Sequence, residues 1–418
     1  MMTGSAQNCT HLLNGTASMS APLTPSEQFT HDLCTDSFLS LWCYNNPLGK
    51  KDKELCDVLV VCDPDIVVFS VKEVALEDPD DRVHHERWQR KAVDASVKQL
   101  YGASKWLTSA THVIHADGTQ GIALPPTETR RIHRIAVAFG SGGECSISSG
   151  DFGNGHVHVL TEQSLIDVLT ELDTITDFVH YLSAKEAFLT NCGVVINGTE
   201  ADLLGVYIHA GRTFPEKADL LVVDSGIWDE ICAKPEFKAR KLEDAESYKW
   251  DYLIEVLAGN QGHDNSEFGL DLSDREFVVR GMARENRFCR RLLSNGFVDF
   301  LRDAKAGKTR SRIMQSPSQC LYVFAYFAKD ERRELRLHEL YARCLIARHK
   351  IKDASDVVIG IAFNEFDPAV GSATDLIYLR VDTSNNDWRL EAQRLEDDFG
   401  YFKGRPLRRV AADEFPVQ

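Results

Sequence analysis

The alternation of apolar and polar residues near the start of the chain predicts a helix followed by a β-hairpin. Between Thr24 and Tyr44 the apolar residues recur every three to five positions, and Pro25 lies where a first helical turn would begin. Two short apolar runs follow, Val58 to Cys62 and Ile66 to Val71, and Asp63-Pro64-Asp65 separates them. Because aspartate and proline favour turns, this pattern predicts two antiparallel strands joined by a tight turn.

Segments with helical and strand periodicity alternate along the rest of the chain. Apolar spacing predicts a helix from about Glu86 to Leu107 and helical structure from Thr161 to about Leu189. Strands are expected at 134–139, 220–223, 320–328, 357–363 and 376–381, and a further helix at 334–350. This alternation indicates an α/β protein. Since 418 residues exceed the usual size of one hydrophobic core, we expect two or three domains.

Composition narrows the class of protein. Hydrophobic residues make up 43% of the chain and charged residues 26%, as in globular rather than disordered proteins. No run of about 18 apolar residues could span a bilayer, and the N-terminal residues lack the basic and apolar segments of a secretory signal. The eleven cysteines form no C-x-x-C pair and suit reduced, buried thiols. We therefore expect a cytoplasmic protein without membrane contact, with a disordered lead-in at residues 1–23.

Charge is distributed unevenly along the chain. The formal net charge is −16, yet residues 280–352 contain 18 Lys and Arg against 7 Asp and Glu, a net of +11 that leaves −27 for the remainder. One interpretation is a surface that contacts nucleic-acid phosphates. The alternative is a solvated helical face that pairs with acidic neighbours. In the first case a helix and the loop after it supply the contacts, and the candidate residues are Arg284, Arg287, Arg291, Lys308, Arg310 and Arg312.

The predicted hairpin combines residues that could support phosphodiester hydrolysis. Asp57 begins its first strand and Lys72 follows the apolar run of its second. A two-residue turn at 63–64 places Asp57 opposite Ser70, and one at 64–65 places it opposite Lys72. In both registers the two charged residues share one face of the sheet. A carboxylate there can hold a divalent cation, and a neighbouring lysine can orient water and stabilise developing charge.

This arrangement resembles the PD-(D/E)XK, or restriction-endonuclease-like, superfamily over residues 27–107. The resemblance implies a central mixed sheet flanked by helices. It assigns Glu27 to the first helix of the site, Asp57 to the metal-binding aspartate, Lys72 to the acid-x-Lys element and Gln99 to the following helix. The nuclease-like core with a helical extension would then occupy residues 24–190. A linker or α+β region at 191–275 and a basic α/β domain at 276–418 would follow.

One position departs from the family pattern, because Ser70 occupies the place of the second acidic residue. A serine hydroxyl is a weak metal ligand, so another carboxylate would have to join Asp57. Glu27 and Glu86 are the candidates, whereas alternation turns Glu73 to the other face. The expected activity is Mg²⁺- or Mn²⁺-dependent hydrolysis of DNA, with RNA as a second option.

Two other functions stay open from the sequence. Loss of the second acid fits a non-catalytic module that binds nucleic acid or a partner protein on the same fold. The hairpin is also similar to that of uncharacterised bacterial proteins, which indicates no function. A third hypothesis rests only on the long region from Gly193 to Gln418, to which the patterns assign no role. In this hypothesis the chain is a scaffold or sensor in bacterial defence whose C-terminal half recognises a small ligand. The oligomeric state stays open as well.

Overall fold

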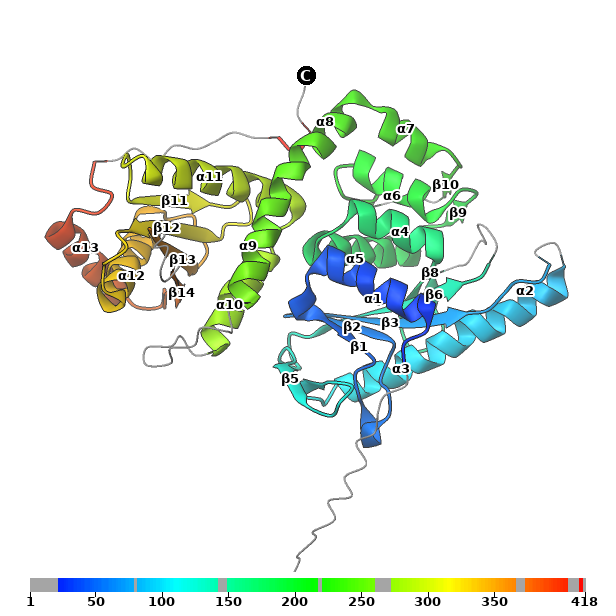
Figure 1. Cartoon of the computed structure of the whole chain (residues 1–418). Helices are drawn as coiled ribbons and strands as arrows, with labels where there is room; N and C mark the ends of the chain where they lie inside the picture. Colours follow the sequence, from blue (N-terminus) through cyan, green and yellow to red (C-terminus); the bar gives the residue numbers. More distant parts are fainter. Residues whose placement is uncertain are drawn as a thin grey trace, which may run out of the picture.

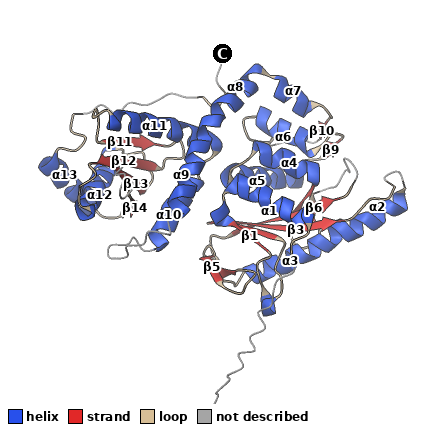
Figure 2. Cartoon of the chain, viewed as in Figure 1, coloured by secondary structure: helices blue, strands red, loops and turns tan. Residues whose placement is uncertain are grey.

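A computed structural model gives the architecture (Figure 1) and describes residues 22–78, 81–141, 149–216, 220–259, 272–365, 373–404 and 413–415. Of the predicted lead-in at 1–23, only residues 22 and 23 fall within these ranges. Figure 2 shows that the strands of the two larger sheets lie between layers of helices. The expected α/β class, with a mixed central sheet flanked by helices, is therefore confirmed.

The N-terminal half is built on a six-stranded sheet in the order β1-β2-β3-β6-β8-β7. Antiparallel pairs join β1 to β2, β2 to β3 and β8 to β7, whereas β3, β6 and β8 run parallel. The strands are β1 (Cys43–Asn45), β2 (Val58–Cys62), β3 (Asp65–Glu73), β6 (Arg131–Phe139), β7 (Gly150–Asp151) and β8 (His156–Thr161). A separate small hairpin consists of β4 (His112–Ile114) and β5 (Gln120–Ala123).

Helices cover both faces of this sheet. One face packs against α1 (Pro25–Phe38), α4 (Glu162–Glu171) and α5 (Ile175–Asn191). The other packs against a nearly continuous helix made of α2 (Arg82–Gln89), the π-helical segment η3 (Arg90–Asp94) and α3 (Ala95–Leu107). All five residues of β2 are buried because its alternate side chains enter the two cores in turn.

The first helix is shorter than the sequence pattern predicts. It begins as expected, with Thr24 as the N-cap and Pro25 in the first turn. It ends at Phe38, and Leu39 adopts a positive φ of 76°. The apolar residues after it lie in the 3₁₀ helix η1 (Ser40–Trp42) and in β1, where Tyr44 pairs with Leu59 of β2. Local periodicity could not separate this short strand from the end of the helix.

The middle of the chain is mainly helical. A two-stranded parallel sheet is formed by β9 (Val194–Ile196) and β10 (Leu221–Val223), with α6 (Glu200–His209) between them. The remaining elements are α7 (Ile227–Ala233), α8 (Pro235–Asp244), the 3₁₀ turn η4 (Ala245–Ser247), α9 (Tyr248–Gly259) and α10 (Leu272–Ala283).

The C-terminal part contains a four-stranded sheet in the order β11-β12-β13-β14, in which only β12 and β13 are parallel. On one face α9 places Trp250 against Tyr322, with ring centroids 5.3 Å apart. The other face packs against α12 through Leu340 and Cys344. The elements are α11 (Arg287–Lys305), β11 (Ser311–Gln315), β12 (Leu321–Phe327), α12 (Arg333–Lys350), β13 (Val357–Asn364), β14 (Thr374–Arg380) and α13 (Asp387–Phe399).

Direct contacts join the two halves of the chain. Arg280 of α10 forms an ion pair of 3.2 Å with Asp63, in the turn between β2 and β3. Glu255 of α9 accepts hydrogen bonds from the amide and hydroxyl of Ser40. Within the described part of the chain, no helix is long and apolar enough to cross a membrane.

Candidate functional site

The register of the β2–β3 hairpin fixes the geometry of the candidate site. Cys62 pairs with Asp65 and Val58 with Phe69, so the two-residue turn is Asp63-Pro64. This is the first of the two registers considered, and Asp57 accordingly comes opposite Ser70. The Asp57 amide donates to the carbonyl of Phe69 at 3.2 Å, which extends the ladder by one residue beyond β2.

Asp57 is the buried carboxylate of the site, with 1% of its surface exposed. Its Oδ2 accepts a hydrogen bond of 2.6 Å from the Val71 amide and lies 3.4 Å from Lys72 Nζ. The predicted placement of Asp57 and Lys72 on one face is therefore confirmed. Burial raises the pKa of Asp57, and the Lys72 charge and the Val71 amide offset this rise only in part.

A chain of polar contacts leads from Ser70 away from the sheet. The Ser70 hydroxyl donates to Gln99 Oε1 at 2.8 Å, and Gln99 Nε2 lies 3.4 Å from Glu54 Oε1. Gln99 reaches this position because α3 packs across β3 and β6. Ser70, which stands where the resemblance would place an acid, therefore orients the Gln99 amide, and Gln99 lies beside the hairpin.

Glu54 is the residue of this site that sequence reasoning missed. Glu54 is exposed at the surface, but partial burial of its carboxyl group, the Asp57 charge, a hydrogen bond with Asp57 and the Glu27 charge, in that order, raise its pKa to about 7. A β-bridge between Leu48 and Glu54 holds the loop before β2 in place. The available signal was an acidic residue three positions before Asp57, but that loop is rich in charge and gave no reason to single it out.

Glu27 lies near the site but already has a structural role. Its Oε2 accepts a hydrogen bond of 2.9 Å from the Thr24 amide and completes a capping box at the start of α1. Its negative charge also raises the pKa values of Asp57 and Glu54. Glu27 therefore contributes to the field at the site, with its carboxylate bonded to its own helix terminus.

The structure does not bring Glu86 to the site, which corrects one candidate metal ligand. Glu86 is exposed and bonded to Arg82 Nε at 2.8 Å within α2. It precedes Gln99 by 13 positions along a nearly continuous helix, which corresponds to about 20 Å at 1.5 Å per residue. Figure 1 shows α2 extending away from the sheet. Glu73 is exposed on the other face, as alternation predicts.

The carboxylates of this site suit a cation that takes few of its ligands from the protein. Among the described residues, no three His, Cys, Asp or Glu side chains are placed to hold a metal ion together. Asp57 and Glu54 nevertheless form a hydrogen-bonded carboxylate pair beside one lysine. Mg²⁺ commonly takes one or two carboxylates and completes its shell with water and substrate phosphate. The pair fits such a site, and it does not fit a site with three protein carboxylates.

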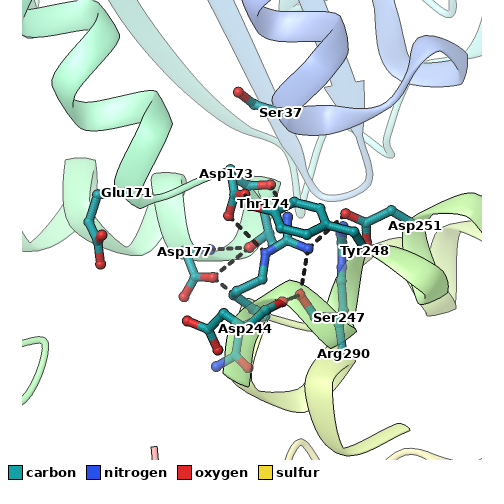
Figure 3. Close-up of polar contacts among 12 residues, drawn as sticks. Ser37, Glu171, Asp173, Thr174, Asp177, Asp244, Ser247, Tyr248, Asp251 and Arg290 are labelled. Carbon is teal, nitrogen blue, oxygen red and sulfur yellow. Dashed lines mark hydrogen bonds and ion pairs between the residues drawn. The ribbon is translucent and has the colours of Figure 1, made fainter. Parts of the chain in front are cut away.

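Two of the six predicted phosphate contacts are buried inside the protein, which corrects their assignment. Arg287 is 3% exposed and donates to Asp251 Oδ2 at 2.7 Å and to Asp173 Oδ1 at 2.8 Å. Arg291 is also buried and pairs with Asp244 at 3.2 Å. Figure 3 shows the acidic side chains of this region, including Asp173, Asp244 and Asp251, converging between helices. A helical pattern of arginines cannot by itself distinguish a surface from a buried ion-pair network.

The other four residues divide between internal contacts and solvent. Arg284 is exposed but donates to the carbonyl of Asp63. Arg312 donates to Asp303 Oδ2 at 2.8 Å. Lys308 and Arg310 are exposed in the loop after α11. The expected continuous basic surface therefore reduces to this loop.

Comparison with known proteins found no matching family model, curated protein or solved structure.

Proposed function

We propose that this protein is a metal-dependent phosphodiesterase that hydrolyses DNA, with its active site on the β2–β3 hairpin. The observation that carries the proposal is the contact group of Asp57, Lys72, Glu54, Ser70 and Gln99 at one end of the central sheet. Three of these side chains occupy positions that the resemblance to PD-(D/E)XK nucleases assigns to catalysis.

The carboxylates of Asp57 and Glu54 would hold a Mg²⁺ or Mn²⁺ ion, with Glu27 adding negative charge. When bound, such a cation polarises phosphate oxygens and lowers the pKa of water. Its charge would also offset the burial and the negative charge of Glu27, which raise the pKa values of both carboxylates. The pair therefore has an electrostatic reason to bind a cation.

Lys72 and Gln99 supply hydrogen-bond donors beside these carboxylates. Lys72 is one-third exposed, and its ammonium is held by Asp57 and by the Val71 carbonyl at 3.0 Å. A fixed ammonium at this point can orient a water molecule and stabilise charge that develops on phosphate. Ser70 fixes Gln99 Oε1, so the amide nitrogen of Gln99 is directed toward Glu54 and can donate to substrate.

The decisive experiment compares two carboxylates on opposite faces of the hairpin. Asp57→Asn should abolish Mg²⁺- or Mn²⁺-dependent cleavage of DNA, whereas Glu73→Gln, the matched exposed control, should leave it unchanged. Calorimetric titration with Mn²⁺ alone should show binding to the wild-type protein that Asp57→Asn removes. If the folded wild-type protein cleaves no DNA or RNA with either ion, the proposal fails.

A non-catalytic binding module is the second candidate. It is favoured by Ser70 in place of the family acid and by the absence of a three-ligand group among the described residues. Binding of nucleic acid or of a partner protein without cleavage, and without dependence on Mn²⁺, would support it.

A further inference from the structure

The C-terminal part of the protein contains a cavity whose lining residues are more than 200 positions away from the β2–β3 hairpin in the sequence. Three segments form it: the loop after α11 with the start of β11, two successive turns of α12, and the segment after α13. Its volume is about 410 Å³, within the range of small-molecule sites. The side chains that define its chemistry are Lys308, Arg310, Ser311, Glu339, Arg343 and Tyr401. Figure 1 shows α12 and α13 at the opposite side of the molecule from α2 and α3.

The charged side chain at the floor of the cavity is Arg343, and its contacts hold it in place. Arg343 is 6% exposed and donates to Ser311 Oγ at 3.1 Å and to Glu339 Oε2 at 2.7 Å. Its guanidinium lies 3.8 Å from the centre of the Tyr401 ring. These contacts fix Arg343 in one geometry and occupy the single carboxylate among the lining residues.

Two further cations, Lys308 and Arg310, lie at the rim of the cavity, and acidic side chains of the protein neutralise them only weakly. Lys308 has 70% of its side chain exposed, and its Nζ lies 3.8 Å from Asp303, which Arg312 already binds at 2.8 Å. Arg310 is exposed, and no ion pair of its side chain occurs among the described residues. With three cations and one engaged carboxylate, the cavity favours an anion.

The side chains that line the cavity favour one class of anion. Lysine and arginine together suit a compact, multiply charged group such as a phosphate. The Tyr401 ring contacts Arg343 and is also stacked on Phe399, with centroids 5.4 Å apart and planes at 9°. Because these neighbours occupy the ring, it offers little surface for stacking a nucleobase. Recognition would therefore rest on charge.

We propose that this cavity binds a phosphomonoester group through Lys308 and Arg310 at its rim, with Arg343 at its floor. The site is independent of the proposed active site on the hairpin. The group could belong to a free small molecule or to the 5′-phosphate of a nucleic-acid end, which offer the same chemistry.

Calorimetry on the full chain tests the site with AMP, adenosine and inorganic phosphate as probes. AMP and phosphate should bind, and adenosine should bind at least about tenfold more weakly, since a charge-assisted hydrogen bond contributes about a factor of ten or more. Lys308→Gln and Arg310→Gln should each weaken AMP binding by about tenfold. Lys305→Gln and Arg302→Gln change exposed cations in the last turn of α11, just before this loop, that do not line the cavity, and they should have no effect.

The source of the phosphate is tested with a single-stranded oligonucleotide carrying either a 5′-phosphate or a 5′-hydroxyl. Tighter binding of the phosphorylated strand than of AMP identifies a nucleic-acid end, and the reverse identifies a free ligand. The proposal is overturned if AMP and adenosine bind equally or not at all. It is also overturned if the double variant Lys308→Gln/Arg310→Gln, folded as judged by circular dichroism, binds AMP like the wild-type protein.

Discussion

At the scale of single residues, Glu54 and Asp57 create an environment that neither would have alone. Burial raises the pKa of both carboxylates, the Asp57 charge raises the pKa of Glu54 further, and Lys72 supplies a single compensating charge. With its pKa raised to about 7, Glu54 is expected to be partly protonated at neutral pH in the metal-free protein. This coupling does not follow from the PD-(D/E)XK pattern that the hairpin resembles, which would place the second carboxylate at position 70.

The pKa of Glu54, raised from 4.5 to about 7, can be measured without metal. Carbon-13 NMR of the metal-free protein should show a carboxyl group titrating near pH 7 that Glu54→Gln removes. Lys72→Met should move the titration to higher pH, because the Lys72 charge lowers the pKa of Glu54. A carboxyl titration that stays near pH 4.5 would contradict the contact between Glu54 and Asp57.

The same shift has a consequence for stability. Between about pH 4.5 and 7 the folded protein binds more protons at Glu54 than the unfolded chain does. The free energy of unfolding should therefore fall as pH rises through this interval, and Glu54→Gln should flatten the dependence. Urea denaturation at several pH values measures both effects.

At the scale of elements, two glycines show how packing decides the effect of one methyl group. Gly360 lies on β13, where an added Cβ would come 2.6 Å from Cys344 Sγ and 3.1 Å from Leu340 Cγ on α12. Gly102 is exposed on α3, and an added Cβ there would meet no atom within 4 Å. The same substitution therefore has opposite expected effects at the two sites.

Gly360→Ala should destabilise the protein by about 1–3 kcal/mol, because the sheet and α12 would have to separate locally. Gly102→Ala should stabilise it by about 0.5–1 kcal/mol, because alanine has the higher helix propensity. Urea denaturation midpoints check both values. Equal stability of Gly360→Ala and the wild-type protein would contradict the packing of α12 on β13.

At the scale of the whole molecule, buried ion pairs connect segments that are distant in sequence. Arg287 joins α11 to Asp173 before α5 and to Asp251 of α9, and Arg290 also pairs with Asp251 at 2.7 Å. Arg291 donates to the carbonyl of Asp413 at 2.9 Å, which draws residues near the C-terminus into the same network. Labelled residues in Figure 3 come from both halves of the chain.

Removal of Arg287 should be strongly destabilising because it takes one cation out of a buried network, so that Asp173 loses its ion pair and Asp251 retains only Arg290. Arg287→Ala is expected to lower the free energy of unfolding by about 3–5 kcal/mol. Arg302→Gln, which changes an exposed arginine on the same helix, should alter it by less than about 1 kcal/mol. Urea denaturation distinguishes the two, and a small loss for Arg287→Ala would place that arginine outside the structural network.

The network also predicts acid sensitivity. Burial alone would raise the pKa of Asp251, but Arg290 and Arg287 hold it below its usual value. A carboxylate of this kind contributes stability above its unfolded pKa of about 3.9, and the contribution is lost as pH falls through the lowered folded pKa. This loss should be smaller in Arg287→Ala.

The sequence alone determined the local features of this protein. The two buried strands and the common face of Asp57 and Lys72 follow from residue alternation, because side chains in a strand point to opposite faces with a period of two. Alternation left the turn open between residues 63–64 and 64–65, and the structure places it at Asp63-Pro64. The helix that follows, with Gln99 on it, could also be anticipated from periodicity and the resemblance, whereas the contact of Gln99 with Ser70 could not.

Only the tertiary structure decided which charged residues meet. The loop before β2 brings Glu54 close to Asp57. Glu86 lies far from the site because it is 13 residues away from Gln99 along a nearly continuous helix. Arg287 is buried among acidic residues that are more than 30 positions away in the sequence. Periodicity identifies which side of an element a residue occupies, but burial depends on what packs against that side. A basic helix therefore has the same sequence signature whether its partner is phosphate or the protein's own carboxylates.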